Sequence, residues 1–134
     1  MSIKEIQFID IPKFADKNGT LIKVESQIET NFIIKRFFQI IASKGDIRGY
    51  HAHLKYSQLM FCSLGKIELH CEDGFEKKMF VLDEPTIGIL LPPLIWSHQK
   101  YLEDNSILNV LSDGEYNEDE YIREYDQYLK ILKK

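Results

Sequence analysis

The sequence predicts an all-β sandwich or barrel that ends in an amphipathic α-helix. Short runs rich in β-branched and aromatic residues recur along the chain, and this pattern is typical of antiparallel sheets. Gly, Asn and Asp cluster between the runs and mark turns. Close to the carboxy terminus the apolar residues recur with the period of a helix instead of that of a strand.

Seven strands are predicted, at residues 20–25, 32–41, 57–64, 66–72, 75–82, 87–91 and 106–111. Turn signals at residues 16–19, 44–46 and 72–74 tolerate a positive φ, whereas Pro85 and the pair Pro92 and Pro93 interrupt hydrogen-bond ladders. Apolar and polar residues alternate over residues 66–71. We therefore predict that His70 faces away from the core, as a partly exposed residue of a sheet.

The carboxy-terminal helix is predicted from apolar and aromatic residues at helical intervals, namely Tyr121, Ile122, Tyr125, Tyr128, Leu129 and Leu132. Asn117 followed by Glu120 is typical of a capping box, and acidic residues lead the segment while lysines end it. We expect this helix to pack on the outside of its own barrel or to contribute to a dimer contact.

Composition limits the classes of function. The 134 residues and 44% hydrophobic content fit one domain that spans residues 1–134. A formal net charge of −4 argues against broad attraction to nucleic acid. No apolar run approaches the ~20 residues of a membrane span, and residues 1–10 lack a basic stretch followed by an apolar core, so a cytoplasmic protein is predicted. Cys62 and Cys71 lack Cys-x-x-Cys spacing and are expected to be free buried thiols.

The most informative motif is the His-x-His pair formed by His51 and His53. Two histidines at i and i+2 on an extended strand project from one face, where they suit a metal site or a general base. Together with Gly45, Gln58 and Gly65, the pair reproduces the spacing of the first motif of the cupin barrel. The chain therefore resembles the cupins, which implies a jelly roll, also called a double-stranded β-helix.

The same residues leave two kinds of chemistry to compare. Metal-binding cupins carry Glu where this chain has Gln58, and an amide oxygen is a poorer ligand than a carboxylate for divalent ions. Pro93 and His98 match the second cupin motif only with Ile95 in place of its glycine. We therefore favour a metal-free pocket in which imidazoles move protons. A metal-dependent dioxygenase that uses the histidine pair and His98 is the alternative.

Two further residues are candidates for ligand contacts. Arg48 lies three residues before His51 and could hold a phosphate or a carboxylate, although an isolated Arg is more often a solvated side chain or part of an ion pair. Trp96 is the single tryptophan. Core packing is its default interpretation, and a wall that stacks on a sugar or a base is the alternative.

Motifs along nearly the whole chain extend the resemblance. They are Asp16-x-x-Gly19, Ile-Lys-Arg at 34–36, Lys-Gly at 44–45, Arg-Gly-Tyr-His-Ala-His at 48–53, Pro-Leu-Ile-Trp at 93–96 and Asp-Glu-Tyr-Ile-Arg-Glu-Tyr-Asp at 119–126. In these strings the chain resembles the nucleotide-sugar 3,4-ketoisomerases. The resemblance implies a homodimeric jelly-roll enzyme without metal or other cofactor, which moves the ketone of dTDP-4-keto-6-deoxyglucose from C4 to C3. Such enzymes supply 3-amino-3,6-dideoxy sugars for bacterial surface glycans.

The implied chemistry assigns roles to five residues. His51 is the expected base and acid, which removes a proton from C3 to give an enediolate and returns one to C4. His53 positions His51 or shares the proton transfer between oxygens. Gln58 is a candidate amide donor to the enediolate. Arg48 is expected to hold the diphosphate, with Arg36 as a second candidate.

The chain departs from the family at several positions. Asn18 stands where relatives commonly carry Arg, Phe37 and Phe38 stand where they commonly carry tyrosines, and Ser97 stands where they often carry His or Arg. These positions bear on the sugar contacts and on the face from which C4 is protonated. Three other functions are therefore weighed. They are a C3/C5 epimerase acting on the same substrate, the metal-dependent dioxygenase and a non-catalytic sugar-nucleotide sensor.

Overall fold

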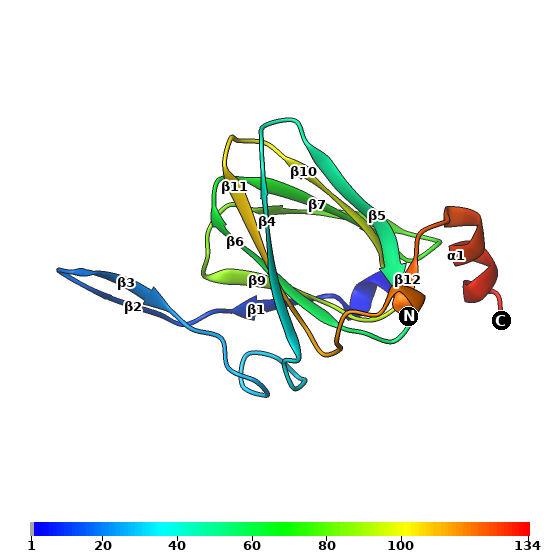
Figure 1. Ribbon diagram of the computed structural model, residues 1–134, viewed down its shortest axis with the longest axis horizontal. Coiled ribbons are helices and arrows are strands. Elements are labelled where there is room, and N and C mark those ends of the chain that lie inside the picture. Colours follow the sequence, from blue (N-terminus) through cyan, green and yellow to red (C-terminus); the bar gives the residue numbers. More distant parts are fainter. Residues whose placement is uncertain (1) are drawn as a thin grey trace.

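The computed structural model describes residues 2–134 and folds most of them into two antiparallel sheets that face each other (Figure 1). One sheet contains, in spatial order, β1 (Gln7–Asp10), β9 (Ile87–Leu91), β6 (Gln58–Leu64), β11 (Ser106–Ser112) and β4 (Arg36–Ala42). The other contains β12 (Tyr121–Ile122), β5 (Ile47–His53), β10 (Trp96–Tyr101), β7 (Ile67–Glu72) and β8 (Lys77–Leu82). The predicted all-β jelly roll is confirmed, and it is followed by the helix α1 (Tyr125–Leu132).

The core lies between the two sheets because each strand places alternate side chains on opposite faces. Ile67 and Leu69 of β7 point inward and are fully buried, as are Ile89 of β9 and Leu108 of β11. Burial of each such side chain stabilises the fold by roughly 1.5–3 kcal/mol. The alternate positions of β7, including His70, are only partly buried, which confirms the predicted orientation of this histidine.

Two glycines form turns on either side of the β5 and β6 segment. Gly45 precedes β5 with a φ of 91°, and Gly65 follows β6 with a φ of 86°, a region that side chains with a Cβ rarely adopt. A Cβ on Gly65 would lie 2.3 Å from Ser106 Oγ, whereas a Cβ on Gly45 would meet nothing within 4 Å. The two glycines of the sequence motif therefore form two turns, and only the second turn also lacks the space for a side chain.

Several strands differ from their sequence predictions. β5 and β10 lie outside the predicted strand ranges, as do β1 and β2 (Lys13–Asp16). β10 has a polar sequence because Ser97 and Gln99 point into the barrel, where both are buried. The strand predicted at 32–41 begins only at Arg36, and the strand predicted at 20–25 corresponds to β3 (Gly19–Ile22).

The carboxy-terminal helix begins later than the apolar period indicated. α1 starts at Tyr125, while Tyr121 and Ile122 form β12. This short strand pairs with β5, and Tyr121 lies opposite His53. The predicted helical position of these two residues is therefore wrong, because pairing with a distant strand determines their conformation.

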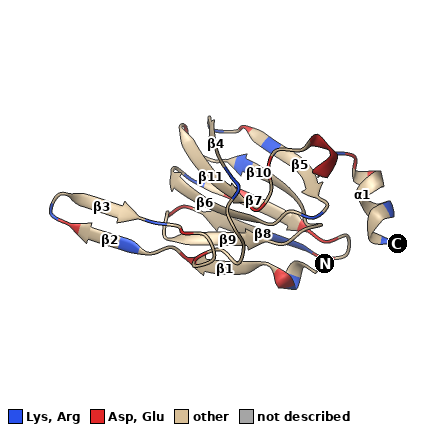
Figure 2. Cartoon of the chain, turned by 60° about the horizontal axis from the view of Figure 1, so that its bottom comes forward, with Lys and Arg blue, Asp and Glu red and all other residues tan. Residues whose placement is uncertain are grey.

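Asn117 and Glu120 do not form the predicted capping box. Asn117 instead caps the 3-10 turn η2 (Glu118–Glu120) and accepts a backbone N–H of that turn at 3.0 Å. The carboxylate of Glu120 accepts the backbone N–H groups of Lys55 and Tyr56 at 2.8 and 2.9 Å. These bonds tie the acidic turn, red between β5 and α1 in Figure 2, to the loop that follows β5.

α1 packs on the outer face of the sheet, behind the histidine pair. Tyr128 is fully buried, with its ring centroid 5.4 Å from that of Trp96, and its hydroxyl donates to the carbonyl of Leu94 at 2.9 Å. Ala52, which lies between the two histidines in the sequence, belongs to the same buried cluster. The helix therefore packs on the outside of its own barrel, which is one of the two placements predicted for it, and supports β5 there.

Both cysteines are free and buried, as predicted. Burial raises the pKa of the Cys71 thiol to about 12 and also raises the pKa of Cys62. Neither side chain is therefore a reactive thiolate near neutral pH. Within residues 2–134, no helix has the length and apolar character needed to cross a membrane.

Candidate active site

The two histidines of β5 point into one end of the barrel. Their ring centroids lie 5.2 Å apart, with the ring planes at 88°. Just before them, Tyr50 has a φ of 58°, and the register between β5 and β10 shifts at this point. This β-bulge places Tyr50 on the outer face, where its ring stacks on His98, while both histidines stay inside.

Tyr121 completes a cluster of rings around the histidine pair. Its ring centroid lies 4.5 Å from that of His53 and 5.1 Å from that of His51. The guanidinium of Arg123 lies over the Tyr121 ring at 4.4 Å, and its Nε donates to Glu118 Oε1 at 2.6 Å. The cation–π contact and the ion pair together fix the phenol ring beside both imidazoles.

Burial keeps both imidazoles neutral at pH 7. It lowers the pKa of His51, and together with the charges of His51 and Arg36 it lowers the pKa of His53 to about 3. Nδ1 of His51 and both ring nitrogens of His53 have no hydrogen-bond partner within residues 2–134. A neutral imidazole is a base that can take a proton from a ligand.

A cavity of about 560 Å³ opens beside His51, and this volume is typical of small-molecule sites. Three of the residues predicted to take part in catalysis or substrate binding line this cavity, namely His51, Arg48 and Gln58. Gln58 also reaches the small space next to His53, so it lies beside both histidines. Sequence reasoning missed four further polar residues of the cavity wall, which are Gln39, Gln99, Tyr121 and Arg123.

Some of these residues could have been identified from the sequence and others could not. Tyr121 and Arg123 belong to the string at 119–126 that carried the family resemblance. Gln99 had no such signal. It is 3% exposed, and its Oε1 has no hydrogen-bond partner among the described residues. A Cβ on Gly49 would come within 3.2 Å of Gln99 Nε2, so the glycine leaves room for this amide.

Arg36 lies at the first position of β4, between two aromatic rings. Its guanidinium carbon is 5.0 Å from the ring centroid of Phe38 and 5.7 Å from that of Tyr116. Nε and one terminal nitrogen are buried without a hydrogen-bond partner in residues 2–134. Because arginine keeps its charge, these unpaired donors suit an anionic group supplied by a ligand.

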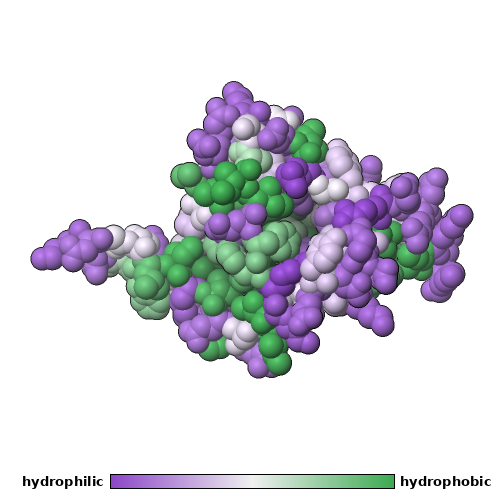
Figure 3. All heavy atoms as spheres, viewed as in Figure 1, coloured by the Kyte–Doolittle hydropathy of each residue, from purple (hydrophilic) through white to green (hydrophobic). Residues whose placement is uncertain are grey.

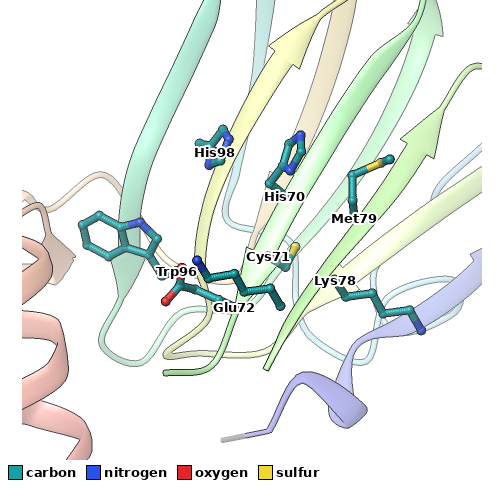
Figure 4. Close-up of a pocket in the computed structure, with 8 residues that line it drawn as sticks. His70, Cys71, Glu72, Lys78, Met79, Trp96 and His98 are labelled. Carbon is teal, nitrogen blue, oxygen red and sulfur yellow. The ribbon is translucent and has the colours of Figure 1, made fainter. Parts of the chain in front are cut away.

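Trp96 lies on the opposite face of the sheet from the histidine pair, in line with core packing, its default interpretation. Figure 4 shows it beside His98 and His70, around a second cavity of about 370 Å³. Trp96 is 7% exposed and packs beneath α1 in the cluster with Tyr128. The structure therefore supports core packing for Trp96 in place of a wall that stacks on the substrate.

His98 does not join the histidine pair to form a metal site. It faces outward and stacks between Tyr50 and His70, with ring centroids 4.5 Å away on each side. Across the described residues, no group of three or more His, Cys, Asp or Glu side chains is arranged to hold a metal ion. The donor set that a three-histidine dioxygenase requires is therefore divided between two faces of one sheet.

Comparison with known proteins assigns a family to this arrangement. The model of the family described as FdtA, WxcM-like, C-terminal, matches residues 4–133. A curated relative, TDP-4-oxo-6-deoxy-alpha-D-glucose-3,4-oxoisomerase from Aneurinibacillus thermoaerophilus, is 32% identical over 131 residues. The match covers 97% of this chain and 94% of the relative.

Solved structures with the same fold have related activities. QdtA, a sugar 3,4-ketoisomerase from Thermoanaerobacterium thermosaccharolyticum in complex with TDP, matches with a TM-score of 0.94 and 32% identity over 98% of this chain and 96% of QdtA. A histidine-to-asparagine variant of QdtA was solved with TDP-4-keto-6-deoxyglucose. WlaRB, a TDP-quinovose 3,4-ketoisomerase from Campylobacter jejuni, matches with a TM-score of 0.90 and 29% identity over 96% of this chain and 99% of WlaRB.

Proposed function

This chain belongs to the FdtA (WxcM-like) family of sugar 3,4-ketoisomerases, and we propose that its substrate is dTDP-4-keto-6-deoxyglucose. Its activity is that of an isomerase. The proposed substrate rests on one observation. A neutral His51 lies on the wall of a ligand-sized cavity that is also lined by Arg48 and Arg123. The complexes of QdtA with TDP and of its variant with the keto sugar support the same choice.

His51 is proposed to carry the proton between the two carbon atoms. The hydrogen on C3 of the sugar lies next to the C4 carbonyl, which acidifies it enough for an imidazole to remove. Removal gives an enediolate, and return of a proton to C4 completes the isomerisation. Such acid–base catalysis typically accelerates a step by ~10² to 10⁴-fold. His53, whose ring lies 5.2 Å from that of His51, is proposed to position it.

Charged and amide side chains are proposed to hold the rest of the substrate. Arg48 lines the cavity and is assigned to the diphosphate. Arg36 is assigned as a second cation because its buried N–H groups lack acceptors in residues 2–134. Gln58 is assigned to donate from its amide to an enediolate oxygen, which an ionised carboxylate in its place could not do.

Conversion of dTDP-4-keto-6-deoxyglucose, followed by proton NMR in D₂O, tests this function. The wild type is expected to move the carbonyl to C3, and His51→Asn is expected to be slower by ~10²-fold or more while it still binds TDP. His70→Asn, on the outer face of the sheet, is the matched control and should retain the wild-type rate. A full rate in His51→Asn would show that another group is the base. Deuterium at C5 without carbonyl migration would identify the C3/C5 epimerase instead.

The product defines the next reaction. A ketone at C3 is the group that a transamination converts to an amine, so we propose that the enzyme supplies 3-amino-3,6-dideoxy sugars for bacterial surface glycans. We further propose that it works in the cytoplasm. The free thiols of Cys62 and Cys71 support this location, because unpaired cysteines are typical of reducing compartments.

We propose that the working form is a homodimer of single-domain subunits. The hairpin of β2 and β3 projects away from the body (Figure 1), and its cross-strand pair Phe14 and Leu21 is 60% and 58% exposed. Figure 3 shows a hydrophobic area on the body next to the base of this hairpin. The edge strand β4 also exposes Phe37 and Ile41. A second copy that covers the hairpin and this edge would bury apolar surface that monomers rarely leave in water.

Light scattering at micromolar concentration tests the dimer. We expect the mass of two chains for the wild type and a shift toward one chain for Leu21→Lys, because a charge on the hairpin opposes burial of its apolar pair. Phe75→Lys, which changes an exposed aromatic residue between β7 and β8, is the control and should remain dimeric. A monomeric wild type would contradict the proposal.

A further inference from the structure

The ketone migration moves two protons, and the role of His51 accounts for one of them. One proton leaves C3 and one reaches C4. In addition, the O3 hydroxyl must lose its proton as C3 becomes the ketone, while O4 gains a proton. We propose that Tyr121 carries this second proton between the two sugar oxygens. The inference rests on the function proposed above and adds a catalytic residue to it.

The wall of the 560 Å³ cavity offers few groups that exchange protons. Its ionisable side chains are Arg48, His51, Tyr121 and Arg123, and arginine keeps its protons in proteins. Phe38 also lines the cavity, but its ring has no hydroxyl. His53 borders only the small space behind His51 and is not part of this wall. Because His51 is occupied with the carbon-bound proton, Tyr121 is the remaining lining residue that can donate and accept one.

The surroundings of Tyr121 fix its ring and leave its hydroxyl free. The ring contacts both imidazoles, and Arg123 lies over it at 4.4 Å. The hydroxyls of Tyr128 and Tyr125 already have partners within the chain, since they donate to the carbonyl of Leu94 and to the carboxylate of Glu72. None of the side-chain hydrogen bonds within residues 2–134 involves the Tyr121 hydroxyl, so it is available to a ligand in the cavity.

The proposed step balances in atoms and electrons. As His51 takes the proton from C3, the C–H pair forms the C3–C4 double bond, the carbonyl π pair moves to O4, and O4 takes the phenolic proton of Tyr121. The tyrosinate then removes the O3 proton, and that O–H pair forms the C3 carbonyl. The double-bond pair takes the proton of the His51 imidazolium at C4. Both side chains return to their starting states, and the guanidinium of Arg123 stabilises the transient tyrosinate.

Tyr121→Phe, with Tyr125→Phe as the matched control, tests the role. Tyr125 lies in α1, outside the cavity wall. We expect kcat for ketone migration to fall by about 10²-fold or more in Tyr121→Phe, with KM and the affinity for TDP unchanged. Tyr125→Phe should keep the wild-type kcat. An unchanged kcat in Tyr121→Phe, or a loss confined to KM or to TDP binding, overturns the proposal.

A pH profile separates proton transfer from a structural role. If Tyr121 transfers a proton in the reaction, kcat depends on the acidity of the phenol at this position. 3-Fluorotyrosine is a more acidic phenol than tyrosine and has nearly the same shape, so at position 121 it should shift the pH profile of kcat, whereas the same change at position 125 should not. If the pH profile of kcat is the same with 3-fluorotyrosine as with tyrosine at position 121, the proposal is overturned. This comparison remains decisive if Tyr121→Phe does not fold. A wild type that binds the keto sugar but never converts it overturns the proposed function as well, and this is seen before any variant is made.

Discussion

Acid should destabilise this protein through His53, and the structure sets the size of the effect. His53 is 6% exposed, and burial followed by the charges of His51 and Arg36 lowers its pKa to about 3. In the unfolded chain the pKa of a histidine is ~6.5. Between these two values the unfolded chain binds a proton that the folded chain does not. The stability that depends on neutral His53 is therefore complete above pH ~6.5 and declines as the pH falls toward about 3.

The magnitude follows from the slope of stability against pH. One group that is protonated only in the unfolded chain lowers the free energy of unfolding by ~1.4 kcal/mol per pH unit. Integration from pH ~7 to ~5 gives a loss of about 2 kcal/mol from His53 alone. His53→Gln removes the titrating group and keeps a polar side chain. Because all other carboxylates and histidines titrate in both proteins, their contributions cancel when the two losses are compared.

Urea unfolding at several pH values between ~7 and ~5, at one protein concentration, measures this difference. We expect the wild type to lose about 2 kcal/mol more than His53→Gln over this range. His70→Gln is the matched control, since His70 lies partly exposed on the outer face, and it should behave like the wild type. Equal pH dependence in the wild type and in His53→Gln would refute the reasoning that burial keeps His53 neutral.

Two further predictions concern the turns and the cavity. Gly65→Ala should lower stability in thermal unfolding more than Gly45→Ala does. Both positions have a positive φ, which costs a residue with a Cβ ~1 kcal/mol or more, but only the new Cβ at Gly65 collides with Ser106. Equal losses of stability in the two variants would contradict this. Gln58→Glu should move the acid limb of kcat/KM against pH to higher pH, because a carboxylate in the cavity raises the pKa of His51. Rates measured across that limb check the direction, and a shift to lower pH would show that the two side chains do not interact as the cavity indicates.

Local sequence patterns were sufficient where a strand separates an apolar core from solvent. β7 alternates Ile67 and Leu69 with polar residues, and both its strand conformation and the outward direction of His70 followed from that period. The same reasoning failed for β10, because its inward residues Ser97 and Gln99 are polar and line the cavities beside the histidine pair. A strand that serves a polar site loses the alternation that would reveal it.

Long-range contacts explain the other differences. Tyr121 fits the helical period of the residues after it, and only its pairing with β5 places it in a strand beside the histidines. Glu120 has the spacing of a capping residue, but its carboxylate binds the backbone of the loop after β5. Trp96 begins β10, for which no strand was predicted, and no local pattern showed which face of that strand it occupies. The histidine pair was predictable because its face depends only on the two-residue spacing.

The position of Trp96 also gives the protein a built-in optical probe. It is the single tryptophan of the chain, and the next residue, Ser97, pairs across the sheet with His51. Its indole lies beneath α1, on the far side of the sheet from the histidine pair, and is not part of the wall of the cavity beside His51. Fluorescence emission therefore comes from one known site behind the histidine strand. It reports when that strand or the helix moves, without any attached label.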